Sequence, residues 1–143
     1  MSESRSSGVV RIYIDGAARG NPGHAGVGVV LVMDGVVRRF GEYVGVRTNN
    51  EAEYVALIKG LELALEMGFR ETIFYSDSQL LVRQIRGEYK VRSKKLMTLY
   101  GQAVGLISAL SSFKIVHVER VENSEADRLA NQAIDKKLGR FRD

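Results

Sequence analysis

The chain has 143 residues, a length that suits one compact domain with a core of its own. It contains no cysteine, which excludes a disulfide scaffold and fits a reducing compartment, so we expect a cytoplasmic protein. The formal net charge of +4 favours polyanionic partners without singling them out. No apolar run approaches the ~20 residues of a membrane span, so no membrane association is expected.

The domain organisation is simple, because the sequence has no internal repeat, linker or low-complexity block. We expect a single domain over residues 9–138. Residues 1–8 are polar and lack the apolar stretch of a signal peptide, which favours a flexible N-terminal tail. Residues 139–143 are expected to form a short C-terminal tail. A monomer is the expected state.

The first part of the chain predicts three antiparallel strands. Val9–Asp15 is rich in β-branched residues and predicts a strand. Gly16–Gly28 is glycine-rich and is interpreted as a turn region. Val27–Met33 and Val36–Val46 are apolar runs joined by Asp34-Gly35, which is typical of a tight hairpin.

A long helix follows this meander. It begins at Thr48, where Thr48 and Glu51 have the spacing of a capping box, as do Asn50 and Glu53. Apolar residues at helical spacing continue from there, and Gly68 has the position of a C-terminal cap.

Two further strands alternate with three further helices. Thr72–Tyr75 predicts a strand, which leads into a short helix from Ser78 to Ile85. An apolar stripe from Leu96 to Leu110 predicts the next helix, Phe113–Val118 the last strand, and Asn123 is expected to cap the final helix. This order implies an α/β fold, in which a mixed sheet of three antiparallel and then two parallel strands is flanked by helices. In such sheets, sites gather at the carboxyl ends of the parallel strands.

Four acidic residues sit at strand ends or helix starts. Asp15 ends the first predicted strand, and turn chemistry is the simple alternative. Asp77 ends a later strand, where it could instead cap the following helix. Glu53 lies four residues before Leu57 on the buried stripe and so points toward the sheet, although a capping role stays open. Asp127 borders the stripe of the last helix, where a position near the helix N-terminus would itself favour an acid.

The predicted sheet would bring these four carboxylates to one edge. Several carboxylates cannot share a small site as bare charges. Magnesium resolves this, because it binds carboxylate and water oxygens, whereas the sequence has no His/Cys cluster for zinc. Two such ions about 4 Å apart would clamp an in-line displacement at a phosphodiester.

Four motifs then carry a family resemblance. Residues 12–23, 48–54, 75–79 and 122–131 each contain one of the four acids. In this order and spacing they resemble type 1 ribonuclease H, and the resemblance runs from Val9 to Leu138. It is to a compact form that lacks the basic protrusion of the best-studied members.

The resemblance implies a ribonuclease H-like fold with a five-stranded mixed sheet. It implies an endonuclease that uses Mg²⁺ or Mn²⁺, two ions per site, to hydrolyse the RNA strand of RNA–DNA hybrids. The products would carry 3′-hydroxyl and 5′-phosphate ends. Double-stranded RNA stays open as a second substrate. The family's metal ligands, which are also its catalytic acids, fall on Asp15, Glu53, Asp77 and Asp127.

The resemblance also implies a set of substrate contacts. Reading RNA requires contacts to the 2′-hydroxyl, which amide side chains can both donate to and accept from. Thr48 is implied to contact a phosphate of the DNA strand, and helix capping is the alternative for Asn49 and Asn50. The residues are Gly16, Asn21, Thr48, Asn49, Asn50 and Gln79.

Two departures from the family change what is expected. The segment Gly87–Lys95 is too short for the protrusion, so nearby Lys and Arg residues are expected to supply part of the grip on the hybrid, with a merely solvated face as the alternative. Binding should then depend strongly on salt. Many members also place a histidine before the last helix, where this chain has none. Our hypothesis is that Arg120 takes this position and stabilises phosphate charge, while His117 is packed and not catalytic.

Other readings of the same acids stay open. One is an exonuclease or an integrase core on the same architecture. Another is a non-catalytic module that binds hybrids or double-stranded RNA, and a third is a structural subunit of a polymerase assembly. Thr-Asn-Asn before Glu53 together with Asn-Pro-Gly after Asp15 favours the endonuclease over the first reading, and the presence of all four acids favours it over a binding module.

Overall fold

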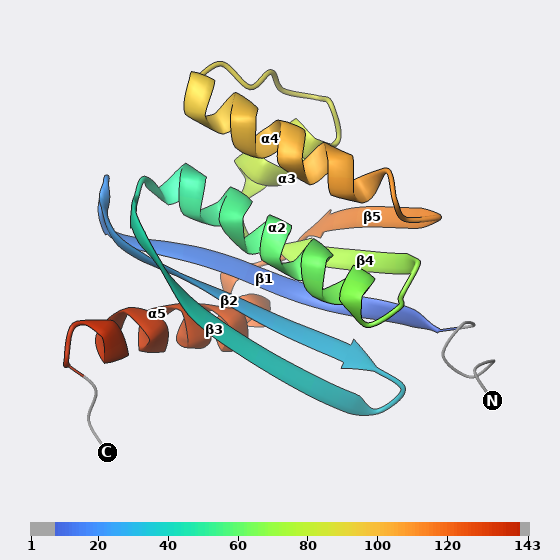
Figure 1. Cartoon of the computed structure of the whole chain (residues 1–143), viewed down its shortest axis with the longest axis horizontal. Coiled ribbons are helices and arrows are strands. Elements are labelled where there is room, and N and C mark those ends of the chain that lie inside the picture. The colour runs from blue at the N-terminus through green and yellow to red at the C-terminus, as the bar shows by residue number, and fades with distance from the viewer. Residues whose placement is uncertain (1–7, 141–143) are drawn as a thin grey trace.

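The computed structural model describes residues 8–140. Of the two expected tails, only Gly8, Gly139 and Arg140 fall within these residues, and the rest lies outside them. The described chain forms one sheet with helices on both faces (Figure 1). The strands are β1 (Val9–Gly20), β2 (Gly23–Met33), β3 (Val36–Arg47), β4 (Glu71–Ser76) and β5 (Ser112–His117). The helices are α2 (Asn49–Glu66), α3 (Gln79–Ile85), α4 (Lys94–Ile107) and α5 (Ser124–Lys137), and the 3₁₀ turn η1 (Arg120–Asn123) precedes α5.

The sheet has the order β3-β2-β1-β4-β5. β1 pairs with β2 and β2 with β3 in antiparallel fashion, whereas β4 pairs in parallel with both β1 and β5. The prediction of a five-stranded mixed sheet is therefore confirmed. The predicted hairpin is confirmed too, because Asp34 and Gly35 both have positive φ, at 49° and 79°, as a tight turn between β2 and β3 requires.

The predicted glycine-rich turn over Gly16–Gly28 is wrong. β1 continues to Gly20 and β2 begins at Gly23, so the strands extend almost through the whole segment. The glycines instead let helix backbones approach the sheet. A Cβ on Gly16 would lie 2.2 Å from the carbonyl oxygen of Ala52 in α2. A Cβ on Gly28 would lie 1.9 Å from the carbonyl oxygen of Ala126 in α5.

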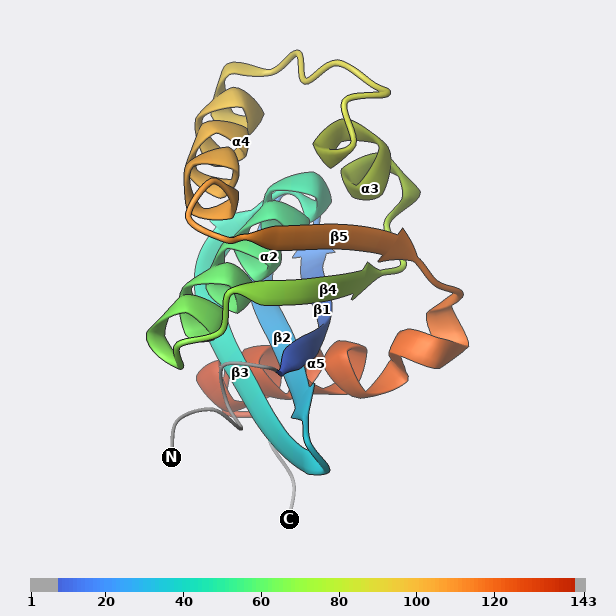
Figure 2. The same ribbon diagram turned by 90° about the vertical axis from the view of Figure 1, so that its right-hand side faces the viewer.

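Two layers of helices enclose the sheet. α2 packs on β1 and β2, and α4 packs on α2 (Figure 1). α5 covers the opposite face over β1, β2 and β3, while α3 lies beside β4 and β5 (Figure 2). Among residues 8–140, no helix combines the length and the apolar character that crossing a membrane requires. The fully buried side chains of the main core include Ile12, Ile14, Val27, Val29, Leu31, Tyr54, Leu57, Leu61 and Phe74.

Candidate active site

Parallel pairing of β1 and β4 places two of the acids side by side. The last residue pair of this ladder is Tyr13 with Tyr75, so Asp15 and Asp77 each lie two residues beyond it. The two strands diverge there, and β1 continues without β4. Asp15 therefore lies inside a strand and not at its end, which makes the turn interpretation of Asp15 wrong.

Glu53 reaches the same place from the first turns of α2. Thr48 and Glu51 form the predicted capping box, in which Thr48 Oγ1 accepts from the Glu51 N–H at 3.1 Å and Glu51 Oε1 accepts from the Thr48 N–H at 2.9 Å. The capping alternative for Glu53 is thus wrong. Its Oε1 instead accepts a hydrogen bond from the backbone N–H of Gly16 at 3.2 Å. The close approach of α2 to Gly16 is what makes this contact possible.

Asp77 is also free of a capping role. α3 is capped by Ser78, whose Oγ accepts from the Leu81 N–H at 3.2 Å. The alternative that Asp77 caps this helix is therefore wrong. Carboxylate oxygens of Asp15, Glu53 and Asp77 all lie within 4.8 Å of one another, a spacing at which they could hold a metal ion.

Asp127 approaches this triad from the opposite face of the sheet. It lies in the first turn of α5, and it lines the same hollow as the other three acids. We call this surface the acidic hollow. Its lining residues are Asp15, Gly16, Ala17, Ala18, Asn49, Glu53, Asp77, Arg120 and Asp127.

Asn123 has a different role from the one predicted. It stands at the N-cap position of α5 but makes no side-chain cap hydrogen bond there. Its buried side chain instead donates from Nδ2 to the carbonyl oxygen of Ile14 at 2.8 Å. This contact ties the start of α5 to β1, one residue before Asp15. Sequence reasoning missed it because the bond joins residues 109 positions apart.

The acids strongly perturb one another. Burial, followed by the charges of Glu53 and Asp77, raises the pKa of Asp15. Burial, followed by the charge of Asp77, also raises the pKa of Glu53, while the Gly16 N–H and the Arg120 guanidinium oppose this rise. The hollow cannot hold all of its negative charge without a proton or a cation, and an all-carboxylate donor set favours a cation that prefers oxygen.

These raised pKa values predict how the stability of the metal-free chain depends on pH. The folded chain retains protons on Asp15 and Glu53 at pH values where the unfolded chain has lost them, above about pH 4. The free energy of unfolding should therefore fall as the pH rises from 5 to 9, which urea denaturation in chelator would measure. Added Mg²⁺ should flatten the slope. If Asp15→Asn left the pH dependence of the free energy of unfolding unchanged, the raised pKa of Asp15 would not be its cause.

The residues predicted to contact substrate divide into two groups. Gly16 and Asn49 line the acidic hollow, and Asn21 borders it, since its Oδ1 accepts from the Asn49 N–H at 2.9 Å. Thr48 lies at the adjoining helix start and uses its hydroxyl in the cap. Asn50 and Gln79 are exposed and lie outside the lining. Since Thr48 is the cap of α2, the capping alternative for Asn49 and Asn50 is wrong.

Arg120 lies at the rim of the hollow, whereas both histidines lie outside its lining. Arg120 is exposed, and its charge favours the ionised form of Glu53. His24 is hydrogen-bonded through Nδ1 to the hydroxyl of Tyr43 at 2.8 Å. His117 is a half-buried residue at the end of β5. This arrangement leaves Arg120 as the one basic side chain that lines the hollow, within residues 8–140.

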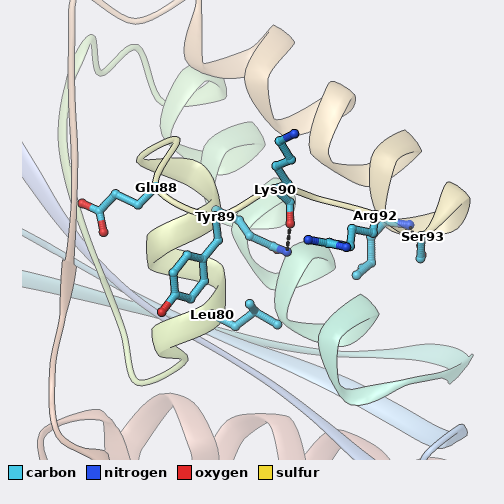
Figure 3. Close-up of a pocket in the computed structure, with 8 residues that line it drawn as sticks. Leu80, Glu88, Tyr89, Lys90, Arg92 and Ser93 are labelled. Atoms are coloured by element: carbon cyan, nitrogen blue, oxygen red, sulfur yellow. Dashed lines mark hydrogen bonds between the residues drawn. The ribbon is translucent and has the colours of Figure 1, made fainter.

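A second hollow lies between α3 and α4 (Figure 3). Lys90 and Arg92, from the segment Gly87–Lys95, line it together with the ring of Tyr89. Gln84 also lines this hollow and is held by two hydrogen bonds. Its side chain accepts from the buried Tyr54 hydroxyl at 2.7 Å and donates to the carbonyl oxygen of Lys90 at 3.2 Å. Tyr54 follows Glu53 in α2, so one helix supports both hollows.

Comparison with known proteins places the chain in a family. A family model described as reverse transcriptase-like matches residues 13–133. Ribonuclease HI of Halobacterium salinarum is 43% identical over 130 residues, which cover 90% of this chain and 65% of the relative. The bifunctional protein Rv2228c of Mycobacterium tuberculosis is 42% identical over 129 residues, which cover 88% of this chain and 35% of the relative. The chain thus spans about two thirds and one third of the length of these relatives.

Solved structures agree with the sequence matches. The crystal structure of the Halobacterium salinarum protein has a TM-score of 0.87 at 42% identity and covers 90% of this chain and 98% of its own. LC11-RNase H1, isolated from compost, was solved in complex with an RNA/DNA hybrid. It has a TM-score of 0.85 at 40% identity and covers 90% of this chain and 99% of its own. With its mixed sheet and clustered acids, the chain belongs to the type 1 ribonuclease H family.

Proposed function

We propose that the chain is an endonuclease that hydrolyses the RNA strand of RNA–DNA hybrids and leaves 3′-hydroxyl and 5′-phosphate ends. The observation that carries this proposal is the carboxylate triad, whose oxygens lie within 4.8 Å of one another just beyond the point where the pairing of β1 with β4 ends. The hybrid bound to LC11-RNase H1, which is 40% identical to this chain, supports the choice of substrate.

The donor set of the acidic hollow fits Mg²⁺ or Mn²⁺. All of its acidic groups offer oxygen, and the raised pKa values of Asp15 and Glu53 reflect a charge that a divalent cation would compensate. Asp15, Glu53 and Asp77 would hold one ion, and Asp127 with Asp15 would hold a second. When bound, such ions supply Lewis-acid activation of a water and neutralise charge on the leaving oxygen.

The protein's own groups orient these ligands and the phosphate. The Gly16 N–H donates to Oε1 of Glu53 and so orients this carboxylate beside Asp15 and Asp77. Asn123 holds the backbone of Ile14 and so fixes the position of the neighbouring Asp15. Arg120, exposed at the rim, is placed to bind a non-bridging phosphate oxygen as charge develops on it.

Recognition of the hybrid would use surfaces on both sides of the triad. Gly16, Asn21, Thr48, Asn49, Asn50 and Gln79 are proposed to contact the strands next to the acidic hollow. Asn and Gln amides can both donate to and accept from a 2′-hydroxyl, which only the RNA strand carries. In the second hollow, Lys90 and Arg92 would present positive charge to the paired strand, so binding should weaken steeply with salt.

A panel of duplexes tests the proposed function. Internally labelled, end-blocked RNA–DNA, RNA–RNA and DNA–DNA duplexes would be incubated with Mg²⁺, Mn²⁺ or chelator. We expect internal cleavage of the RNA in the hybrid, with either metal and not in chelator. Cleavage only from free ends, or binding without metal-dependent cleavage, would contradict the proposal. The RNA–RNA arm decides whether double-stranded RNA is a second substrate.

Replacing Arg120 should slow the reaction without unfolding the chain. Because the side chain is exposed, Arg120→Ala should leave the unfolding midpoint unchanged, while kcat on a hybrid falls by roughly 100-fold. Arg120→Lys should recover part of this loss, since it restores a positive charge but not the planar fork. Arg128→Ala, an exposed arginine on α5, is the matched control. An unchanged kcat in Arg120→Ala would remove Arg120 from the mechanism.

A further inference from the structure

A column of polar side chains on α5 leads from the surface to Asp127. Asp127, Asn131 and Asp135 are spaced four residues apart, so they lie above one another on one side of the helix. Arg19, near the end of β1, reaches across to this column. The result is a chain of hydrogen bonds from Asp135 through Arg19 and Asn131 to the carboxylate of Asp127.

We propose that Asn131, oriented by Arg19, is a positioning residue that fixes the carboxylate of Asp127 toward the acidic hollow. This inference rests on the proposed function, because it concerns the ligand set of the same site. Neither Asn131 nor Arg19 lines the hollow, so each acts through Asp127.

The amide of Asn131 can support Asp127 in one of its two orientations only. Its Nδ2 donates to the carbonyl oxygen of Asp127 at 3.0 Å and to Oδ1 of the same residue at 3.2 Å. If the amide turned over, its oxygen would face those two oxygens, and the contact would become repulsive. A donor on the opposite side of the amide is therefore needed to fix its orientation.

Arg19 supplies that donor. Its Nη2 donates to Oδ1 of Asn131 and to the carbonyl oxygen of the same residue, both at 3.2 Å. Its Nη1 donates to Oδ1 of Asp135 at 2.5 Å, and this bond lowers the pKa of Asp135. The planar guanidinium makes these contacts together, which a lysine ammonium on a flexible stem cannot reproduce.

These contacts are better suited to orienting the side chain of Asp127 than to stabilising the folded chain. The side chains of Arg19 and Asp135 are 32% and 34% exposed, and ion pairs of that kind contribute little to folding. Their effect is that the Asn131 amide donates to Oδ1 of Asp127. The same carboxylate lines the acidic hollow and interacts there with the side chain of Asp15, so a contact that holds Oδ1 also orients Asp127 toward the other acids.

The test compares Asn131→Leu, Arg19→Met and their double variant with the matched control Arg39→Met. Arg39 pairs with Glu125 and so also links α5 to the sheet, but neither residue lines the acidic hollow. Mutation of a residue that orients a metal ligand typically lowers metal affinity or activity by about 10- to 100-fold. We expect each single variant to weaken Mn²⁺ binding, measured by calorimetry, and to lower kcat by about 10-fold with KM nearly unchanged.

The double variant should cost no more than the worse single variant, because both residues act through one contact. In the metal-free chain, the side-chain NH₂ signals of Asn131 should change in Arg19→Met and in Asp127→Ala but not in Arg39→Met. These NMR and metal-binding readouts need no substrate, so they test the inference even if no duplex is cleaved. Unchanged Mn²⁺ affinity in Asn131→Leu, or an equal loss in Arg39→Met, would overturn it.

Discussion

Asp15→Asn is expected to abolish hybrid cleavage while making the metal-free chain more stable. Asparagine keeps the shape of the side chain but removes the charge that shares a cation with Glu53 and Asp77. Losing several kcal/mol of metal-assisted stabilisation would lower kcat by about 10³-fold or more. The same substitution removes a buried carboxyl whose pKa burial and two neighbouring acids raise, so the free energy of unfolding in chelator should increase by roughly 1–3 kcal/mol at neutral pH.

Two measurements on one variant separate these effects. Cleavage of a labelled hybrid reports the loss of activity, and urea denaturation in chelator reports the gain in stability. Glu62→Gln is the matched control, because Glu62 is an exposed acid on α2, outside the acidic hollow. It should change neither quantity. A variant that is inactive and also less stable would mean that Asp15 serves packing, and the mutual repulsion of the acids would have to be reconsidered.

The clustering of Asp15, Glu53 and Asp77 could be predicted from the sequence, because the expected sheet brings strand ends and the start of the long helix to one place. Glu53 occupied an apolar helical stripe, and the capping box that could have explained it was used by Glu51. For Asp77 the sequence left a capping role open, and only the structure shows that Ser78 caps the helix instead. The sheet order could be predicted as well, because hairpin chemistry and the alternation of strands and helices left few topologies.

The supporting residues could not be found in the same way. Asn123 and Arg19 act on partners 109 and 112 residues away, so their roles exist only after α5 has docked on the sheet. The glycines misled the sequence interpretation for the same reason. Gly16 and Gly28 look like turn residues locally, but in the fold they admit the backbones of α2 and α5. Only the i, i+4 spacing of Asp127 and Asn131 was a local signal.

Gly28→Ala is expected to have the largest effect on stability, because it blocks the docking of α5. The added Cβ would lie 1.9 Å from the Ala126 carbonyl oxygen and 3.0 Å from the Ala130 nitrogen, which are backbone atoms that no rotamer change can move. Overpacking typically costs about 1–3 kcal/mol and occasionally more, and we expect the upper end of this range. Thermal or urea unfolding would measure it.

The control for this substitution is Gly101→Ala in the middle of α4, where an added Cβ meets nothing within 4 Å. Alanine there should stabilise the chain by up to about 1 kcal/mol through helix propensity. Gly28→Ala should also lower kcat under conditions where the variant is still folded, since α5 carries Asp127 and a shifted helix would move that carboxylate relative to Asp15. If Gly28→Ala matched Gly101→Ala in both stability and kcat, close docking of α5 would not be what joins Asp127 to the other acids. The same substitution therefore tests the packing of the fold and the assembly of its site.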